Sequence, residues 1–221
     1  MVSPAKRHVF LTGGTGYLGR PLIQRLLAQG HQVRALIRPG SEQKLPSGCE
    51  PILGNALEGS SYASQICPAD TFVQLVGVAH PSPAKAGEFR SIDLASGRSA
   101  VQAAASAGVQ HFVYVSVAHP APMMKAYISV RAECEKAIGE SGMNATILRP
   151  WYVLGPGRRW PLLLKPMYWL MERVPSTRES GKRLGLVTIE QMVNALVQAV
   201  ENPAQGVRIL GVPEIRNGST R

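Results

Sequence analysis

The stretch Thr12-Gly13-Gly14-Thr15-Gly16-Tyr17-Leu18-Gly19 decides the fold of this chain. A short apolar run at residues 8–11 precedes it, and leucines at helical spacing follow it. Glycines at positions 13, 16 and 19 allow a tight turn, a close approach of the backbone to a ligand, and a helix packed closely on a strand. The stretch therefore predicts a strand, a turn and a helix whose amino end holds a pyrophosphate, which indicates a dinucleotide cofactor.

Strand-like and helix-like segments alternate beyond this turn. Helices are expected at residues 93–107 and 124–140, and further strands at 33–37, 50–53, 71–78, 112–117, 145–148 and 207–210. Such alternation predicts right-handed crossovers and a parallel sheet covered on both faces. The expected fold class is α/β, a doubly wound parallel sheet (Rossmann fold). Residues 1–157 would form this domain, and 158–221 a short C-terminal lid or substrate segment integrated with it.

The C-terminal segment contains two helical patterns. Residues 188–191 have the Thr-x-x-Gln form of a capping box, and an apolar stripe at residues 189–200 predicts a helix packed on the core. The earlier pattern, 162–174, lies in an aromatic-rich stretch with Trp160, Tyr168 and Trp169. This stretch is compatible with a substrate lid, with peripheral membrane contact through 160–174, or with ordinary docking onto the core.

The composition indicates a packed, basic protein. Of 221 residues, 45% are hydrophobic, and 24 Lys and Arg against 14 Asp and Glu give a net charge of +10. Residues 149–183 hold eight cations and two acids, a net +6. This segment favours an anionic substrate, an acidic partner or a membrane surface, or else is a solvated basic face. No zinc-finger or RNA-recognition signature is present, so a nucleic-acid partner is not expected.

The cysteines and the apolar runs concern the cellular compartment. Cys49, Cys67 and Cys134 are an odd, widely spaced set, which predicts a reducing compartment, no disulfide framework and no metal site. The chain has neither a run of about eighteen apolar residues nor a signal-peptide core. We therefore expect a soluble cytoplasmic protein, while the oligomeric state stays open.

The end of the second strand bears on cofactor choice. NAD-selective sites usually place an acid there to hold the ribose 2′-hydroxyl, but this chain reads Leu36-Ile37-Arg38. The planar guanidinium of Arg38 suits a 2′-phosphate, with Arg34 a poorer helper. NADP(H) is therefore the preferred cofactor and NAD(H) the alternative.

These features together resemble the extended and atypical branches of the short-chain dehydrogenase/reductase superfamily, the NAD(P)-dependent epimerase/dehydratase-like proteins. The likeness is greatest to the complex I accessory-subunit-like and nitrogen-regulator-like subgroup. The residues that carry it are the glycine turn, Gly54-Asn55-Ala56-Leu57, the strand Phe112 to Ser116, Tyr127-x-x-x-Arg131, and Arg149-Pro150 with Gly155-Pro156-Gly157.

The resemblance implies a Ser-Tyr-Lys catalytic set in which Tyr exchanges a proton with the substrate and Lys holds the ribose. Tyr127 matches the Tyr, and Arg131 stands where the family has Lys. The positive charge of Arg131 is expected to favour the phenolate form of Tyr127. The Ser position falls at Ala118 or Val117, just after Ser116. His119 follows directly, so the expected catalytic residues are Tyr127, Arg131, Ser116 and His119. His80, which ends the preceding strand, is another histidine at the edge where ligands bind.

The same resemblance gives an expected cofactor site. The glycine turn would hold the pyrophosphate, Asn55 the adenine and Arg131 the ribose, next to the small residues Gly77 and Ala79. The full set comprises Gly13, Thr15, Gly16, Tyr17, Leu18, Gly19, Arg38, Asn55, Ala56, Val76, Gly77, Val78, Tyr127, Arg131 and Pro150.

Two functions follow from this set. The first is an NADP(H)-dependent oxidoreductase that moves a hydride between nicotinamide and an alcohol/carbonyl substrate. The second is a non-catalytic NADP(H)-binding sensor or assembly protein that binds a partner through its basic C-terminal face. Tyr127 and the aromatic stretch favour the first, whereas Arg131 and Ala118 favour the second. An epimerase or dehydratase is less expected, because such enzymes usually need a longer substrate domain.

Overall fold

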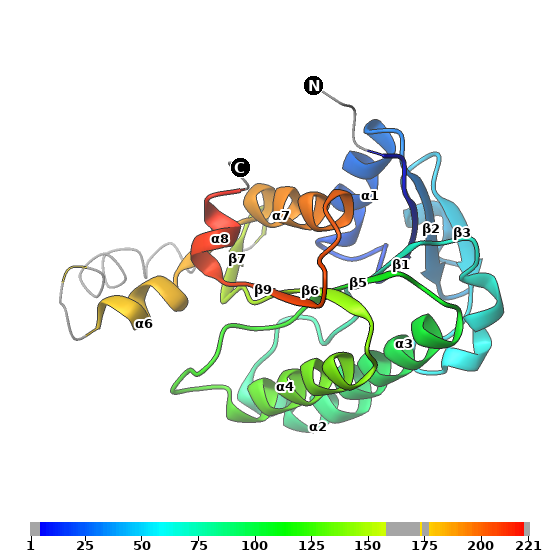
Figure 1. The fold of residues 1–221 in the computed structure, drawn as a ribbon. Helices are drawn as coiled ribbons and strands as arrows, with labels where there is room; N and C mark the ends of the chain where they lie inside the picture. Colours follow the sequence, from blue (N-terminus) through cyan, green and yellow to red (C-terminus); the bar gives the residue numbers. More distant parts are fainter. Residues whose placement is uncertain (1–4, 158–172, 174–176, 219–221) are drawn as a thin grey trace.

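A seven-stranded parallel sheet forms the centre of the structure, a computed structural model that describes residues 5–157, 173 and 177–218 (Figure 1). The strand order is β3-β2-β1-β4-β5-β6-β9, and every neighbouring pair is parallel. The strands are β1 (His8–Thr12), β2 (Gln32–Ile37), β3 (Glu50–Leu53), β4 (Thr71–Gln74), β5 (His111–Val115), β6 (Asn144–Leu148) and β9 (Val207–Leu210). The predicted doubly wound parallel fold is confirmed.

The order in which strands are added to the sheet reverses between β1 and β4. The chain first runs outward from β1 through β2 to β3, and then returns to place β4 on the other side of β1. Thr12 and Gln74, the last residues of β1 and β4, lie opposite each other in the register. Ligands of open α/β sheets bind beyond the carboxyl ends of the strands at such a switch point. The glycine turn leaves from this point.

Helices cover both faces of the sheet (Figure 1). On one face lie α1 (Gly19–Ala28) and α7 (Ile189–Glu201), and on the other α3 (Ala95–Ser106) and α4 (Lys125–Glu140). Alternate residues of a strand point to opposite faces, so Val9 and Leu11 pack in the α1 and α7 layer and Phe10 in the other. Phe10, Phe72 and Phe112 pair side by side, with ring centroids 5.3 Å apart at each step.

The C-terminal region contributes a strand to each of two sheets. A two-stranded parallel sheet pairs β7 (Tyr152–Leu154) with β8 (Leu186–Thr188), which the sequence did not predict. Thr188 and Gln191 form the predicted capping box at the start of α7. The region also contains α6 (Arg178–Arg183) and α8 (Val212–Arg216). The helix predicted over 162–174 and the roles considered for 160–174 lie outside the described residues, apart from Arg173.

Short helical segments fill the connections. They are η1 (Glu42–Lys44), η2 (Gly59–Ser61), η3 (Ala63–Gln65), η4 (Pro83–Lys85), α2 (Ala86–Glu88) and the π-helical η5 (Phe89–Leu94). The helix predicted over 93–107 therefore begins within η5 and becomes α-helical at Ala95. The strand predicted over 71–78 ends at Gln74, because beyond it the amide of Val78 donates to the Asp93 carboxylate instead of to a strand.

Two further observations concern the cysteines and the length of the helices. Cys49, Cys67 and Cys134 all carry free thiols. Within the described part of the chain, no helix combines the length and the apolar character that crossing a bilayer requires.

A buried histidine lies at the amino-terminal edge of the sheet. His111 opens β5, is 1% exposed, and its Nε2 lies 3.0 Å from the Thr146 hydroxyl. Arg208 donates to the same hydroxyl at 3.1 Å. Burial lowers the pKa of His111 from its ordinary 6.5 to about 4, with Arg208 and Arg7 adding to the effect.

This histidine should make the protein less stable in mild acid. The unfolded chain protonates the imidazole near pH 6.5, whereas the folded chain resists until about pH 4. The free energy of unfolding should therefore fall through this window, by up to about 3 kcal/mol from this group. Urea unfolding at several pH values should show a flatter dependence in His111→Gln than in the wild type. An exposed-site control, His80→Asn, should keep the wild-type slope, and equal slopes in all three proteins would contradict the assignment.

Candidate cofactor and active site

The turn after β1 is packed as closely as glycine permits. Gly13 has φ +78°, and a Cβ added there would lie 2.9 Å from the carbonyl carbon of Leu75. The amide of Gly16 donates to the carbonyl of Gly13 at 3.0 Å and closes the turn. A Cβ on Gly19 would collide with Gly13 and Gly14, so the start of α1 lies directly against the turn. The three predicted glycines therefore each have a steric reason.

The turn leaves a cradle on its open side. Gly16 is exposed, and a Cβ added there would contact Gly13 alone, at 3.1 Å. Thr15, Tyr17 and Leu18 are half-buried around it. The first turn of α1 carries no acid, so no carboxylate competes for its amides. Backbone amides at a helix start fit a pyrophosphate, so the residues present fit the expected cofactor.

The two arginines of the second strand have different surroundings. Arg34 donates to the carbonyls of Gln65 at 2.6 Å and Cys67 at 2.7 Å, and pairs with Glu50 at 2.8 Å. It therefore braces β2 against the segment before β4. Arg38 follows β2 directly and is exposed at the carboxyl edge.

Asn55 follows β3 at the same edge. Its side-chain oxygen accepts from the amide of Leu57 at 3.1 Å, and its backbone is fixed by two hydrogen bonds with Ser61. Ala56 is half-buried beside it. A carbonyl oxygen has two lone pairs, so the Asn55 amide retains the capacity to accept a second hydrogen bond.

The centre of the site is a buried ion pair that the sequence analysis missed. Arg131 on α4 lies 2.5 Å from Asp93, between Nη2 and Oδ1, and Asp93 is the fifth residue of η5. The two side chains are 7% and 0% exposed. A Cβ on Gly77 would collide with Nη2 of Arg131 and lie 3.0 Å from Asp93 Oδ1. The pair therefore lies directly against the backbone that follows β4, where Val76, Gly77 and Val78 were expected to meet the cofactor.

Two tyrosines flank the guanidinium of Arg131. Its Cζ atom lies 5.6 Å from the ring centroid of Tyr114 and 5.0 Å from that of Tyr127. Nη1 donates to the Tyr114 hydroxyl at 3.2 Å and to the Val115 carbonyl at 2.8 Å. The ring of Tyr127 also packs on Phe89, with centroids 4.9 Å apart. Tyr127 and Arg131 are thus together on one face of α4, as their spacing predicts.

Arg131 lowers the pKa of Tyr127, as the sequence predicts, but burial outweighs this effect. The net shift is upward, because burial is the largest influence on the Tyr127 pKa and Asp93 also raises it. The sequence analysis considered the charge of Arg131 without the burial of the phenol. Tyr127 is therefore a phenol at neutral pH.

The two remaining catalytic candidates lie at the end of β5. Ser116 is 3% exposed, and its hydroxyl has no hydrogen-bond partner among the described residues. The amide of Ala118 donates to the carbonyl of Pro150 at 2.9 Å, which places the loop after β5 beside the loop after β6. Val117 and Ala118 are buried and supply no hydroxyl. Nε of Arg131 is a second buried atom without a partner in the described part of the chain.

His119 lies beside an ion pair between Glu135 and Arg149. Its Nε2 lies 3.5 Å from Oε2 of Glu135, one helical turn beyond Arg131 on α4. Arg149, which follows β6, binds the same carboxylate through two contacts of 2.5 and 3.1 Å. Arg149 is therefore a cation of the basic segment that an acid already neutralises.

Little in the sequence indicates that Asp93 and Glu135 lie in the site. Asp93 is the only acid between two arginines, at 90 and 98, and its partner is 38 residues away. The charge alone therefore indicates no partner. What could have drawn attention is an aspartate at a helix position that the apolar pattern assigns to the interior.

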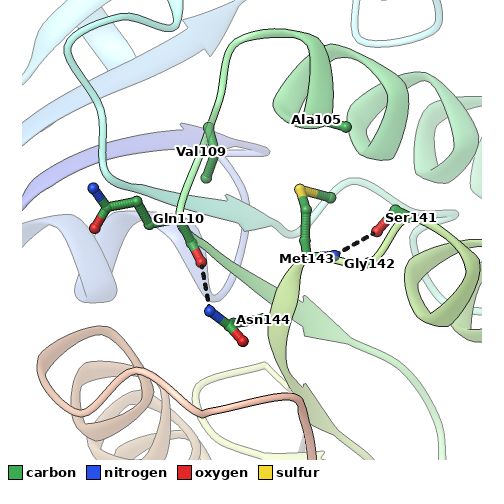
Figure 2. Close-up of a pocket in the computed structure, with 7 residues that line it drawn as sticks. All are labelled: Ala105, Val109, Gln110, Ser141, Gly142, Met143 and Asn144. Carbon is green, nitrogen blue, oxygen red and sulfur yellow. Dashed lines mark hydrogen bonds between the residues drawn. The ribbon is translucent and has the colours of Figure 1, made fainter.

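The hollow shown in Figure 2 lies elsewhere. It has a volume of about 480 Å³ and lies beside the starts of β5 and β6, at the opposite edge of the sheet. Its lining residues are Ala105, Val109, Gln110, Ser141, Gly142, Met143 and Asn144, none of which carries a charge. We therefore assign the site to the carboxyl edge, where the glycine turn, Asp93, Tyr127 and Arg131 meet.

Known proteins share this architecture. The chain is 27% identical over 168 residues to 4-hydroxy-2-methyl-3-oxo-4-farnesyl-3,4-dihydroquinoline-1-oxide ketoreductase of Stigmatella aurantiaca, covering 66% of this chain and 50% of that protein. It is 24% identical over 209 residues to ceramide reductase of Caulobacter vibrioides, covering 94% and 65%. The chain thus spans half to about two thirds of the length of these curated relatives.

A solved structure shows the same fold. The crystal structure of WbmH from Bordetella bronchiseptica, in complex with NAD⁺, superimposes with a TM-score of 0.70 at 20% identity, over 96% of this chain and 80% of that one. A family model described as NAD(P)H-binding matches residues 13–159, which include the glycine turn, the ion pair and Tyr127. The chain therefore belongs to this NAD(P)H-binding family, and the likeness to short-chain dehydrogenase/reductases inferred from the sequence agrees with it.

Proposed function

We propose that the protein is an NADP(H)-dependent oxidoreductase that interconverts a carbonyl and an alcohol, acting chiefly as a reductase. The observation that carries this proposal is Tyr127, held beside Arg131, whose guanidinium lies against Gly77 after β4. The names of the two relatives, a ketoreductase and a ceramide reductase, support reduction as the reaction type. The substrate itself is left open.

The cofactor would lie along the carboxyl edge. The turn at 13–19 would hold the pyrophosphate, Arg38 the 2′-phosphate and Asn55 the adenine. Residues 76–78 and Pro150 would border the ribose and nicotinamide. The unpartnered Nε of Arg131 supports a contact from this side chain to a bound ribose. When bound, the cofactor supplies the hydride.

Tyr127 would act as general acid. During reduction the carbonyl carbon gains a hydride, and the phenol of Tyr127 donates its proton to the carbonyl oxygen, which gives the alcohol. Water then returns a proton to Tyr127. Because Ala118 lacks a hydroxyl, a second hydrogen bond to this oxygen would come from Ser116 or from His119, whose Nε2 lies 3.5 Å from Oε2 of Glu135.

The second candidate function is a non-catalytic NADP(H) sensor or assembly protein. The ion-paired state of Arg131 and the missing hydroxyl at position 118 support it. A partner would bind the basic segment 149–183, which in the first function would favour an anionic substrate. A cytoplasmic location is part of both proposals, and the three free thiols support it.

Cofactor titration tests the role of Arg38. Calorimetry should show tighter binding of NADPH than of NADH, and Arg38→Ala should weaken NADPH about 10- to 100-fold, because a charge-assisted hydrogen bond is lost. NADH affinity should change little. Lys44→Ala, which removes another exposed cation after β2, is the matched control. Equal losses for both cofactors, or for both variants, would argue against a 2′-phosphate contact.

A second substitution separates the two functions. Tyr127→Phe should lower the rate of carbonyl reduction about 10²-fold or more, because the proton donor is removed, while NADPH affinity is retained. Nicotinamide absorbance reports turnover, and Tyr62→Phe, which removes another buried hydroxyl, serves as the control. Undiminished turnover in Tyr127→Phe would exclude the general acid. NADPH binding without turnover of any carbonyl by the wild type would favour the sensor.

A further inference from the structure

Asp93 joins three elements of the site through one carboxylate. Oδ1 pairs with Arg131 on α4 at 2.5 Å, and Oδ2 accepts from the amide of Val78, after β4, at 3.0 Å. The residue lies in η5, where the π-helical turn inserts it between α3 and the end of β4. π-Helical turns occur frequently at functional sites. Both oxygens of Asp93 are thus committed to residues that border the expected cofactor.

Both terminal nitrogens of Arg131 are held by these neighbours. Nη1 is held by the Tyr114 hydroxyl and the Val115 carbonyl of β5, and Nη2 by Asp93. The planar guanidinium offers several donors in a rigid arrangement, so it can bind the carboxylate, a phenol and a carbonyl at once. The lysine that the family usually has here presents a compact ammonium, which cannot reproduce this geometry.

We propose that Asp93 is the positioning residue of this active site: it fixes Arg131 between Tyr114 and Tyr127 and balances the arginine charge beside the Tyr127 hydroxyl. The inference rests on the proposed reductase function. It assigns to Asp93 the task of offsetting part of the effect of the Arg131 charge on the Tyr127 phenol, whose protonated form burial favours. The charged groups that act on Tyr127 are Asp93 from η5 and Arg131 from α4 itself. Tyr114 from β5 and Cys134 from α4 act on Arg131 or on each other.

The effect of the ion pair on the ionisation of Tyr127 follows from these neighbouring groups. An unbalanced arginine beside a half-buried phenol would favour the phenolate. With Asp93 in place, burial is the largest influence on the pKa of Tyr127 and the net result is upward. A general acid must be protonated when the carbonyl binds, and Tyr127 meets this requirement while Asp93 offsets part of the arginine charge.

The test is Asp93→Asn, which keeps the shape of the side chain and removes its charge. Tyrosinate absorbance in the near ultraviolet, titrated with base in the apo protein, should show Tyr127 ionising at least about one pH unit lower than in the wild type. Subtracting the same titration of each protein carrying Tyr127→Phe isolates this group from the other five tyrosines. Asp70→Asn, the matched control at the opposite edge of β4, should leave the titration unchanged.

The kinetic arm uses the same variants with NADPH and a carbonyl substrate. In Asp93→Asn the alkaline limb of the kcat profile should move to lower pH by the amount found in the titration. The titration needs neither cofactor nor turnover. A shifted titration without any turnover would therefore support the pair and contradict the proposed reductase. An unshifted titration in a folded variant would overturn the role of Asp93 even if the protein is a reductase.

A second variant distinguishes an effect on the ionisation of Tyr127 from loss of the fold. Asp93→Asn leaves Arg131 buried without a counter-ion, whereas Asp93→Asn with Arg131→Gln removes both charges together. This double variant should fold and should ionise Tyr127 no earlier than the wild type, because no unbalanced cation remains. If it ionises Tyr127 earlier, the charge balance is not the cause. If both variants unfold while Asp70→Asn does not, Asp93 acts in stability alone and the proposal is overturned.

Discussion

The buried ion pair between Asp93 and Arg131 holds the carboxyl edge of the sheet together. Moving two charges out of water is costly, and the cost is offset when hydrogen bonds satisfy the remaining polar atoms. Here Val78, Tyr114 and Val115 supply those bonds. Loss of one partner would leave a buried charge, at a cost of about 3–5 kcal/mol. A protein that retains such a pair gains a fixed arrangement of η5, α4, β5 and the segment after β4.

The same network reaches the glycine turn through neutral groups. The carbonyl of Asp93 accepts from the Ser96 hydroxyl at 3.3 Å, and Gln74 donates to that hydroxyl at 3.3 Å. The Thr12 hydroxyl in turn donates to the side-chain oxygen of Gln74. Thr12 is the last residue of β1, so the chain of contacts ends where the turn begins. All of these side chains are buried, and buried networks with satisfied partners fix a single geometry. The glycine turn and the surroundings of Tyr127 are thus linked by one continuous set of contacts.

Local features of this edge could be predicted from the sequence, whereas features that depend on distant partners could not. The turn at 12–19 is determined by steric contacts within a few residues. The apolar sequences of β1 to β6 are determined by burial on both faces of the sheet. Both features were therefore predictable. The capping box of α7 is equally local. Asp93 meets Arg131 only because the crossover from β4 to β5 brings η5 against α4. The β7–β8 pair likewise depends on residues about thirty positions apart. Reasoning from the charge of Arg131 alone likewise left out burial, which is the largest influence on the Tyr127 pKa and raises it.

That sign constrains which reaction the edge can support. Oxidation of an alcohol needs a base to accept the hydroxyl proton, and a tyrosine whose pKa lies above its ordinary value is a poor base near neutrality. Reduction needs the protonated form, a phenol that donates to an oxygen as negative charge develops on it. An arginine without a carboxylate would favour the phenolate, whereas Asp93 offsets part of that effect and burial favours the phenol. An arginine at position 131 is thus compatible with a site that holds its tyrosine protonated.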